Sequence, residues 1–163
     1  MKIFDKKEQN KILKIILIIV WMITIFVFSG QQGTESGDTS RKFTVAIIQV
    51  LTGKSLALDD PFIEGIQLFI RKLAHFTIYA IGGFFIMNYA YSTEKAMKQK
   101  IIYSITFGGA YAVTDELHQF FVPGRSGNII DVGIDTLGVI AGISIYIMIQ
   151  AIVEKTINKH RPK

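Results

Sequence analysis

Charged and hydrogen-bonding side chains interrupt three otherwise apolar stretches of the sequence, at spacings typical of one helix face. In the first stretch, Arg71, His75 and Tyr79 recur every four residues. An imidazole beside a carboxylate can exchange protons with a substrate, and a guanidinium can hold a phosphate or a carboxylate through paired hydrogen bonds. These residue types therefore favour either acid–base chemistry or the binding of an anionic group.

The next two apolar stretches contribute the carboxylates. The second stretch carries five polar side chains on adjoining helical positions: Tyr111, Asp115, Glu116, His118 and Gln119. In the third stretch, Asp131 and Asp135 share a stripe with Gly138 and Gly142. Because small residues four apart allow two helices to approach closely, this stripe is expected to face another helix.

A turn rich in glycine connects the second and third stretches, over residues 121–128. Pro123 cannot continue a helix, and the glycines at 124 and 127 permit a tight reversal of the chain. We expect Arg125 to lie at the mouth of the polar cluster, where its rigid guanidinium can grip a carboxylate or a phosphate.

Candidate roles follow from this chemistry. The candidate catalytic residues are His75, Asp115, Glu116 and Asp131, with Asp115 or Glu116 as the base, His75 as its proton partner and Asp131 as the orienting group. The candidate substrate-binding residues are suited to holding a polar head group: Arg71, Lys72, Tyr79, His118, Gln119, Arg125 and Asp135. Imidazole and carboxylate groups suit divalent metals, so a metal held by His75, His118 and carboxylates is left open. No spacing in the sequence matches the zinc motif H-E-x-x-H. The chain has no cysteine, so a cysteine-ligated metal is excluded.

Four long apolar runs must position these residues. Half of the 163 residues are hydrophobic and 19% are charged, which is low for a soluble domain. About 20 apolar residues cross a hydrocarbon core of about 30 Å. We therefore expect an all-α, polytopic membrane bundle, a single domain over residues 1–163, with spans at about 13–30, 70–92, 100–121 and 129–152. Residues 31–65 are expected to form an extracellular loop, exposed over 30–40 and with helical potential over 41–51.

The three polar faces are expected at one depth in the membrane. At 1.5 Å per residue, Asp115 lies about 21 Å above the inner start of its span, while Asp131 and Asp135 lie about 3 and 9 Å below the outer start of theirs. His75 lies one turn inside Arg71. We therefore expect one outward-opening cavity in the outer leaflet, lined by four residues: His75, Glu116, Arg125 and Asp131.

The distribution of basic residues predicts the orientation. Of the 18 Lys and Arg residues, twelve fall in the N-terminal segment, in the connection near residues 95–100 and in the C-terminal tail. Basic residues favour the cytoplasmic side, so both termini are expected in the cytoplasm of a multi-pass protein of the cell membrane. The basic residues behind the net charge of +5 lie between the apolar runs and do not gather on one soluble surface. The pattern therefore favours membrane lipids as partners and excludes nucleic acid.

The motifs that contain these residues resemble those of the VanZ-like family of small bacterial membrane proteins. The resemblance comprises R-K-L-A-H-F-x-x-Y at 71–79, D-E-L-H-Q-x-F-V-P-G-R at 115–125, D-V-x-x-D-x-x-G-x-x-x-G at 131–142 and S-x-Q-x-G-x-x-S at 29–36. It implies a link to tolerance of glycopeptide antibiotics, chiefly teicoplanin. For members outside resistance gene clusters, it implies a role in envelope lipids or the cell wall.

Three classes of function fit the polar cluster. An enzyme, either a hydrolase or a transferase, would act on an anionic lipid or a lipid-linked cell-wall precursor at the outer leaflet. A non-catalytic binder or transporter would use the same groups to hold a head group or relay protons. A structural membrane protein would use them as a buried ion-pair network that fixes the order of the helices.

Overall fold

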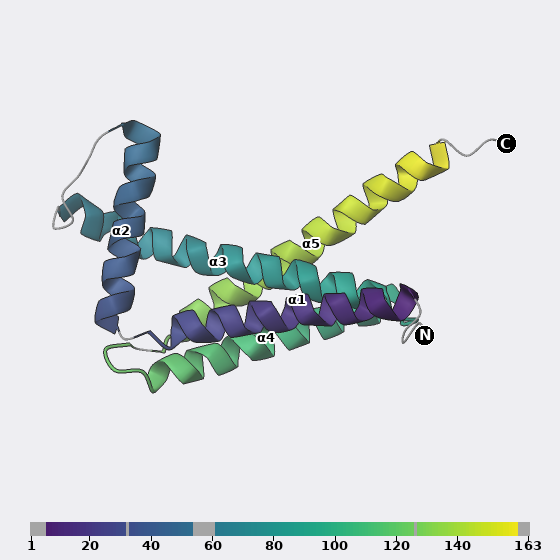
Figure 1. The fold of residues 1–163 in the computed structure, drawn as a ribbon, viewed down its shortest axis with the longest axis horizontal. Helices are drawn as coiled ribbons and strands as arrows, with labels where there is room; N and C mark the ends of the chain where they lie inside the picture. The colour runs from purple at the N-terminus through teal and green to yellow at the C-terminus, as the bar shows by residue number, and fades with distance from the viewer. Residues whose placement is uncertain (1–5, 32, 54–60, 126, 160–163) are drawn as a thin grey trace.

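The computed structural model describes residues 6–31, 33–53, 61–125 and 127–159, and these form five helices and no strand. The helices are α1 (Lys6–Ser29), α2 (Gly33–Thr52), α3 (Pro61–Tyr91), α4 (Met97–Phe120) and α5 (Ile129–Lys159). Helices α1, α3 and α4 run side by side, α5 crosses them, and α2 lies across one end of this bundle (Figure 1). The prediction of an all-α fold is confirmed.

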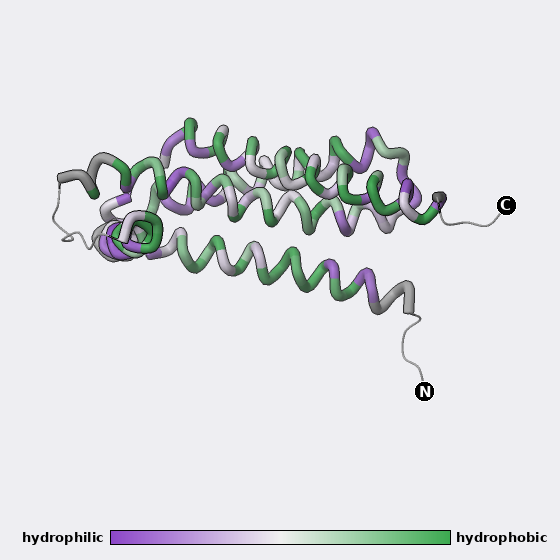
Figure 2. The backbone as a smooth tube through the Cα atoms, turned by 90° about the horizontal axis from the view of Figure 1, so that it is seen from above, coloured by the Kyte–Doolittle hydropathy of each residue, from purple (hydrophilic) through white to green (hydrophobic). Residues whose placement is uncertain are grey.

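Three helices in the described part of the chain are long and apolar enough to cross a membrane: Asn10–Ser29, Ile66–Tyr91 and Ile129–Asn158. Helix α4 is outside this set, and it carries Lys98, Lys100, Asp115 and Glu116. It nevertheless packs against α1, α3 and α5. Apolar residues run along the helices between more polar ends (Figure 2), as expected for a helical membrane protein.

Glycines bring α3 and α5 into the closest helix contact of the bundle. A side chain added at Gly142 would meet the backbone oxygen of Ala80, and one added at Gly138 would meet that of Phe76. On the opposite helix, a side chain at Gly83 would meet the backbone of Val139. The expectation that the stripe of α5 glycines faces another helix is confirmed.

Aromatic side chains attach α1 to the other helices. The Trp21 indole donates a hydrogen bond to the Ile78 carbonyl at 2.9 Å, and its ring occupies the space above Gly82. The Tyr111 hydroxyl of α4 donates to the Met22 carbonyl at 2.6 Å. These contacts place the end of α1 beside the polar residues of α3 and α4.

The expected outer loop over residues 31–65 contains two helical segments, so the prediction of an irregular segment over 30–40 is wrong. Helix α2 begins at Gly33, and α3 begins at Pro61; residues 54–60 lie outside the described part. The helical potential noted over 41–51 is confirmed. Contacts with α3 outweigh the weak helix propensity of the segment: Thr44 and Ile48 are buried, and Gln67 donates to the carbonyl of Gly37 at 3.0 Å.

Candidate functional site

Two ion pairs connect α3 to the first turns of α5. The Lys72 ammonium lies 2.6 Å from a carboxylate oxygen of Asp131, with both side chains partly exposed. One turn deeper, His75 Nδ1 lies 3.6 Å from Asp135 Oδ1, and Asp135 is fully buried. A distance of 3.6 Å is too long for a hydrogen bond, and this second contact is an ion pair when the His75 imidazole is protonated.

A second polar layer connects α4 to α1 and α3. The Gln119 amide donates to Asp115 Oδ2 at 3.1 Å and to the Ser29 hydroxyl at 3.5 Å, and all three residues are buried. The Tyr79 hydroxyl of α3 is buried as well, and it has no hydrogen-bond partner among the described residues. Four helices thus contribute polar side chains to the same end of the bundle.

The turn between α4 and α5 is fixed by Glu116. Its Oε2 accepts a hydrogen bond from the backbone N–H of Asn128 at 2.7 Å. The Asn128 side chain in turn accepts from the N–H of Ile130 at 3.0 Å and caps α5. Gly124 adopts a φ of 75°, a region that favours glycine, which confirms the predicted reversal after Pro123. Glu116 therefore has a structural role in this turn.

Arg125 reaches from this turn to the end of α1. Its Nη1 donates to the Ser29 carbonyl at 3.3 Å. Burial lowers the pKa of the Arg125 guanidinium, and the nearby charge of Arg71 acts in the same direction, whereas Asp115 and Glu116 raise it. An arginine remains charged at neutral pH even so. Two guanidinium groups therefore lie close together at this end of the bundle.

A cavity of about 420 Å³ opens where α1, α2, α3 and the α4–α5 turn meet. Its polar wall includes Arg71, His75, Tyr79 and Arg125, and its apolar wall includes the side chains of Ile25, Phe28, Phe43, Ile70 and Ile78. The shared face predicted for Arg71, His75 and Tyr79 is thus confirmed. We refer to this space as the outer cavity.

The expected common cavity contains His75 and Arg125 but not Glu116 or Asp131. That part of the prediction is wrong because Glu116 is held by the turn and Asp131 by Lys72. His118 also lies elsewhere, stacked on Phe26 of α1 with ring centroids 4.3 Å apart. Seven candidate residues are not part of the lining of the outer cavity: Lys72, Asp115, Glu116, His118, Gln119, Asp131 and Asp135.

Sequence reasoning missed several residues of this site. Ser29, Gln31, Ser40 and Phe43 line the outer cavity. Ser29 and Gln31 belong to the S-x-Q motif, so the sequence contained a signal that could have identified them as site residues. Ser40 and Phe43 belong to α2, and the sequence does not reveal where this helix lies. Among the described residues, no group of three or more His, Asp or Glu side chains is arranged to hold a metal ion.

Long apolar helices that enclose a polar site at one end define a helical membrane protein. A family model described as VanZ/LLP1 matches residues 14–150. Because this match covers most of the chain, the protein belongs to the VanZ/LLP1 family, which confirms the resemblance carried by the motifs. Neither a curated protein sequence nor a solved structure matches the chain.

Proposed function

We propose that the outer cavity binds the phosphate-bearing head group of an anionic lipid or of a lipid-linked cell-wall precursor. The observation that carries this proposal is the pairing of Arg71 and Arg125 in one cavity with an apolar wall. Guanidinium groups suit phosphate oxygens, and the apolar wall suits the first carbons of a lipid chain. Contribution to teicoplanin tolerance would follow from binding or withholding such a precursor.

The geometry favours binding over acid–base catalysis. Glu116 and Asp131, the carboxylates predicted as base and orienting group, are engaged with Asn128 and Lys72 and do not line the outer cavity. His75 lines the cavity and is the remaining candidate for proton transfer. Cleavage of the bound lipid in the experiment below would instead favour the enzyme.

A purely structural role is the second candidate, supported by the two ion pairs between α3 and α5. Ion pairs between two helices can specify which helix faces match. This alternative gives no reason for Arg71 to line the cavity, since its side chain is exposed and contributes little to packing. Binding therefore explains more of the site.

The membrane arrangement that accompanies this proposal has four spans, with α4 as the third to cross, and both termini in the cytoplasm. The start of α1 and the end of α5 lie toward the same end of the bundle as the α3–α4 connection, and α2 lies at the other end (Figure 1). Termini on the same side of a membrane require an even number of crossings. The three most apolar helices give an odd number, so this requirement supports α4 as a fourth span.

Arg71→Gln is expected to weaken binding of a polyprenyl monophosphate to the detergent-purified protein by about 10- to 100-fold, because a hydrogen bond to a charged group contributes about 1.5–3 kcal/mol. Uncharged polyprenol should bind wild type and variant equally. Phosphatidylglycerol, measured in parallel, shows whether a phospholipid or a polyprenyl lipid is preferred. Native mass spectrometry of each lipid complex provides the dissociation constants and detects any cleaved product.

The matched control is Lys42→Gln, which removes one exposed charge from α2 outside the cavity lining. It should leave every dissociation constant unchanged. Equal affinities of wild type and Arg71→Gln for the polyprenyl monophosphate, with equal melting temperatures, would contradict the proposed function.

The topology is tested by single cysteines, since the sequence contains none. A membrane-impermeant maleimide is expected to label Asp38→Cys on α2 in intact cells and to label Lys98→Cys after the cells are opened. Both positions are exposed in the structure. Labelling of Lys98→Cys in intact cells would overturn the assignment of the termini to the cytoplasm.

A further inference from the structure

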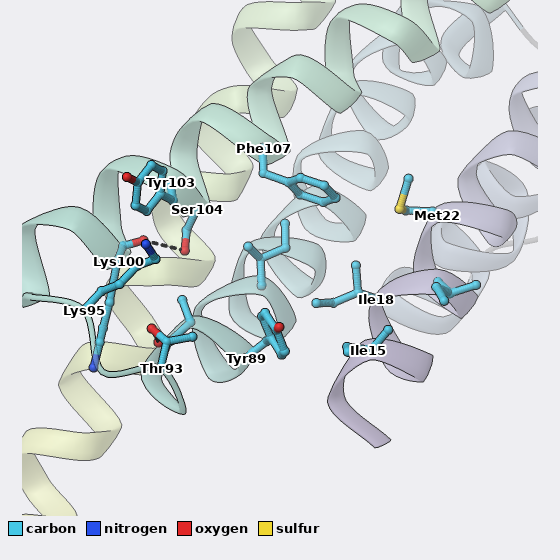
Figure 3. A pocket seen from close by; sticks show the side chains of 13 residues that line it. Ile15, Ile18, Met22, Tyr89, Thr93, Lys95, Lys100, Tyr103, Ser104 and Phe107 are labelled. Carbon is cyan, nitrogen blue, oxygen red and sulfur yellow. Dashed lines mark hydrogen bonds between the residues drawn. The ribbon is translucent and has the colours of Figure 1, made fainter. Parts of the chain in front are cut away.

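A second cavity, also of about 420 Å³, lies at the other end of the bundle, between α1, α3 and α4. Helix α1 diverges from the other helices toward its N-terminal end (Figure 2), and the cavity occupies this divergence as a groove. Its walls are mostly aliphatic and aromatic, and Phe107 of α4 faces Ile18 and Met22 of α1 across it (Figure 3). We refer to it as the inner groove.

Two lysines line the groove at the end nearest the α3–α4 connection. Lys95 and Lys100 have their ammonium groups over the rings of Tyr103 and Tyr91, 4.8 Å and 5.0 Å from the ring centroids. Lys100 also donates to the Tyr91 carbonyl at 3.4 Å. Figure 3 shows the Lys95 side chain directed toward Tyr103 at the rim of the groove, whereas the Lys100 side chain is directed away from Ile18, Met22 and Phe107.

Lys14 adds a third positive charge at this end, although it is not part of the lining. Its ammonium donates to the Asn88 carbonyl at 3.1 Å and to the Ser92 hydroxyl at 2.5 Å. This leaves α1 tied to the connection at one point while the groove stays open beside it. Three lysines therefore lie at this end of the bundle, against two carboxylates, Glu94 in the connection and Glu154 beside Tyr91, which leaves a net positive charge.

We infer that the inner groove binds one acyl chain of an anionic phospholipid, with its phosphate at Lys95. Charge complementarity selects this occupant, because a zwitterionic lipid or an apolar helix offers no net negative charge to this basic end of the groove. This inference goes beyond the proposed function, since the groove shares no lining residue with the outer cavity.

The dimensions of the groove agree with this occupant. From Lys100 to Phe107 on α4 and from Ile15 to Met22 on α1, the walls each run about 10 Å along their helices. One leaflet of the hydrocarbon core is about 15 Å thick, which is the length of one acyl chain across it. A groove of about 10 Å therefore accommodates the part of the chain nearest the phosphate. In the orientation proposed above, the lipid belongs to the cytoplasmic leaflet.

Fluorescence quenching by brominated lipid tests the inference in the full chain. Phe107→Trp places a reporter in the groove, and Ile145→Trp places one on the exposed face of α5, with similar exposure of 45% and 44% for the native side chains. Trp21 is the sole native tryptophan and is buried, so its emission is subtracted as background. The vesicles contain phosphatidylcholine and phosphatidylglycerol in equal parts, with one of the two brominated.

At Phe107→Trp, brominated phosphatidylglycerol should quench with about tenfold preference over brominated phosphatidylcholine, because each lysine near the surface attracts anionic lipid. At Ile145→Trp the two lipids should quench alike. Adding Lys95→Gln and Lys100→Gln should remove the preference at 107. Lys98→Gln with Lys155→Gln makes the same change of charge at exposed positions outside the groove and should leave it intact.

Equal quenching by both lipids at 107 would overturn the inference and show ordinary bulk lipid in the groove. Absence of quenching by either lipid would also overturn it, since it would mean that another protein surface fills the groove. Loss of preference in the Lys98→Gln, Lys155→Gln control would show a general surface charge effect. Because the readout is confined to the inner groove, each result is independent of lipid binding at Arg71.

Discussion

Gly142→Ala is expected to prevent stable assembly of the bundle, whereas Gly133→Ala on the same helix should be tolerated. The methyl group added at Gly142 would occupy the position of the Ala80 backbone oxygen, and the backbone of Phe84 lies close by. Backbone atoms in packed helices cannot move aside as a flexible side chain does. The cost should therefore reach or exceed the upper end of the usual range for overpacking, about 3 kcal/mol.

Gly133 is the matched control because an added methyl group meets nothing within 4 Å. Alanine is the better helix former, so this variant should match or slightly exceed the wild type in stability. Melting of both proteins in the same detergent, followed by circular dichroism, measures the difference. A Gly142→Ala protein that melts at the wild-type temperature would show that α3 and α5 do not pack as described.

Helix identity and the packing faces were predictable from sequence because they depend on local periodicity. The stripe of Asp131, Asp135, Gly138 and Gly142 repeats at helical spacing, so its contact with another helix followed once the segment was taken as a helix, although the partner helix did not. The reversal after Pro123 followed for the same kind of reason, since proline and glycine act on the backbone near them.

The partner of each polar group was not predictable, because it depends on the orientation of each side chain and on the exact position of the neighbouring turn. Glu116 and Asp115 are neighbours in sequence, yet Glu116 accepts from Asn128 in the turn while Asp115 accepts from Gln119 within α4. The position of α2 was also hidden. Its glycine- and serine-rich start resembles a loop until α3 provides a surface for Thr44 and Ile48.

The unpredictable polar partners and the hidden position of α2 explain why Glu116 and Asp131 were wrongly expected to line the cavity. Periodicity placed Glu116 and Asp131 at the correct end of the bundle, but hydrogen bonding and ion pairing directed them away from the outer cavity. The cavity is instead completed by Ser40 and Phe43 of α2. A charge cluster in a membrane helix thus contains both structural and binding groups, and the two must be separated by experiment.

At a pH at which the His75 imidazole is protonated, His75→Ala is expected to destabilise the protein by about 3–5 kcal/mol, because it leaves the buried carboxylate of Asp135 without its ion-pair partner. Adding Asp135→Asn removes the remaining charge and should recover most of this loss. Thermal melting of the single variants and the double variant gives the coupling between the two residues as a double-mutant cycle.

The double variant also separates structure from function. It should fold, yet it should bind the polyprenyl monophosphate more weakly than the wild type, because His75 lines the outer cavity whereas Asp135 does not. His118→Ala is the matched histidine control, since that ring stacks on Phe26 and lies outside the cavity. It should lose about 1 kcal/mol of stability and no affinity. A double variant that recovers both stability and full affinity would assign His75 to the ion pair and not to the binding site.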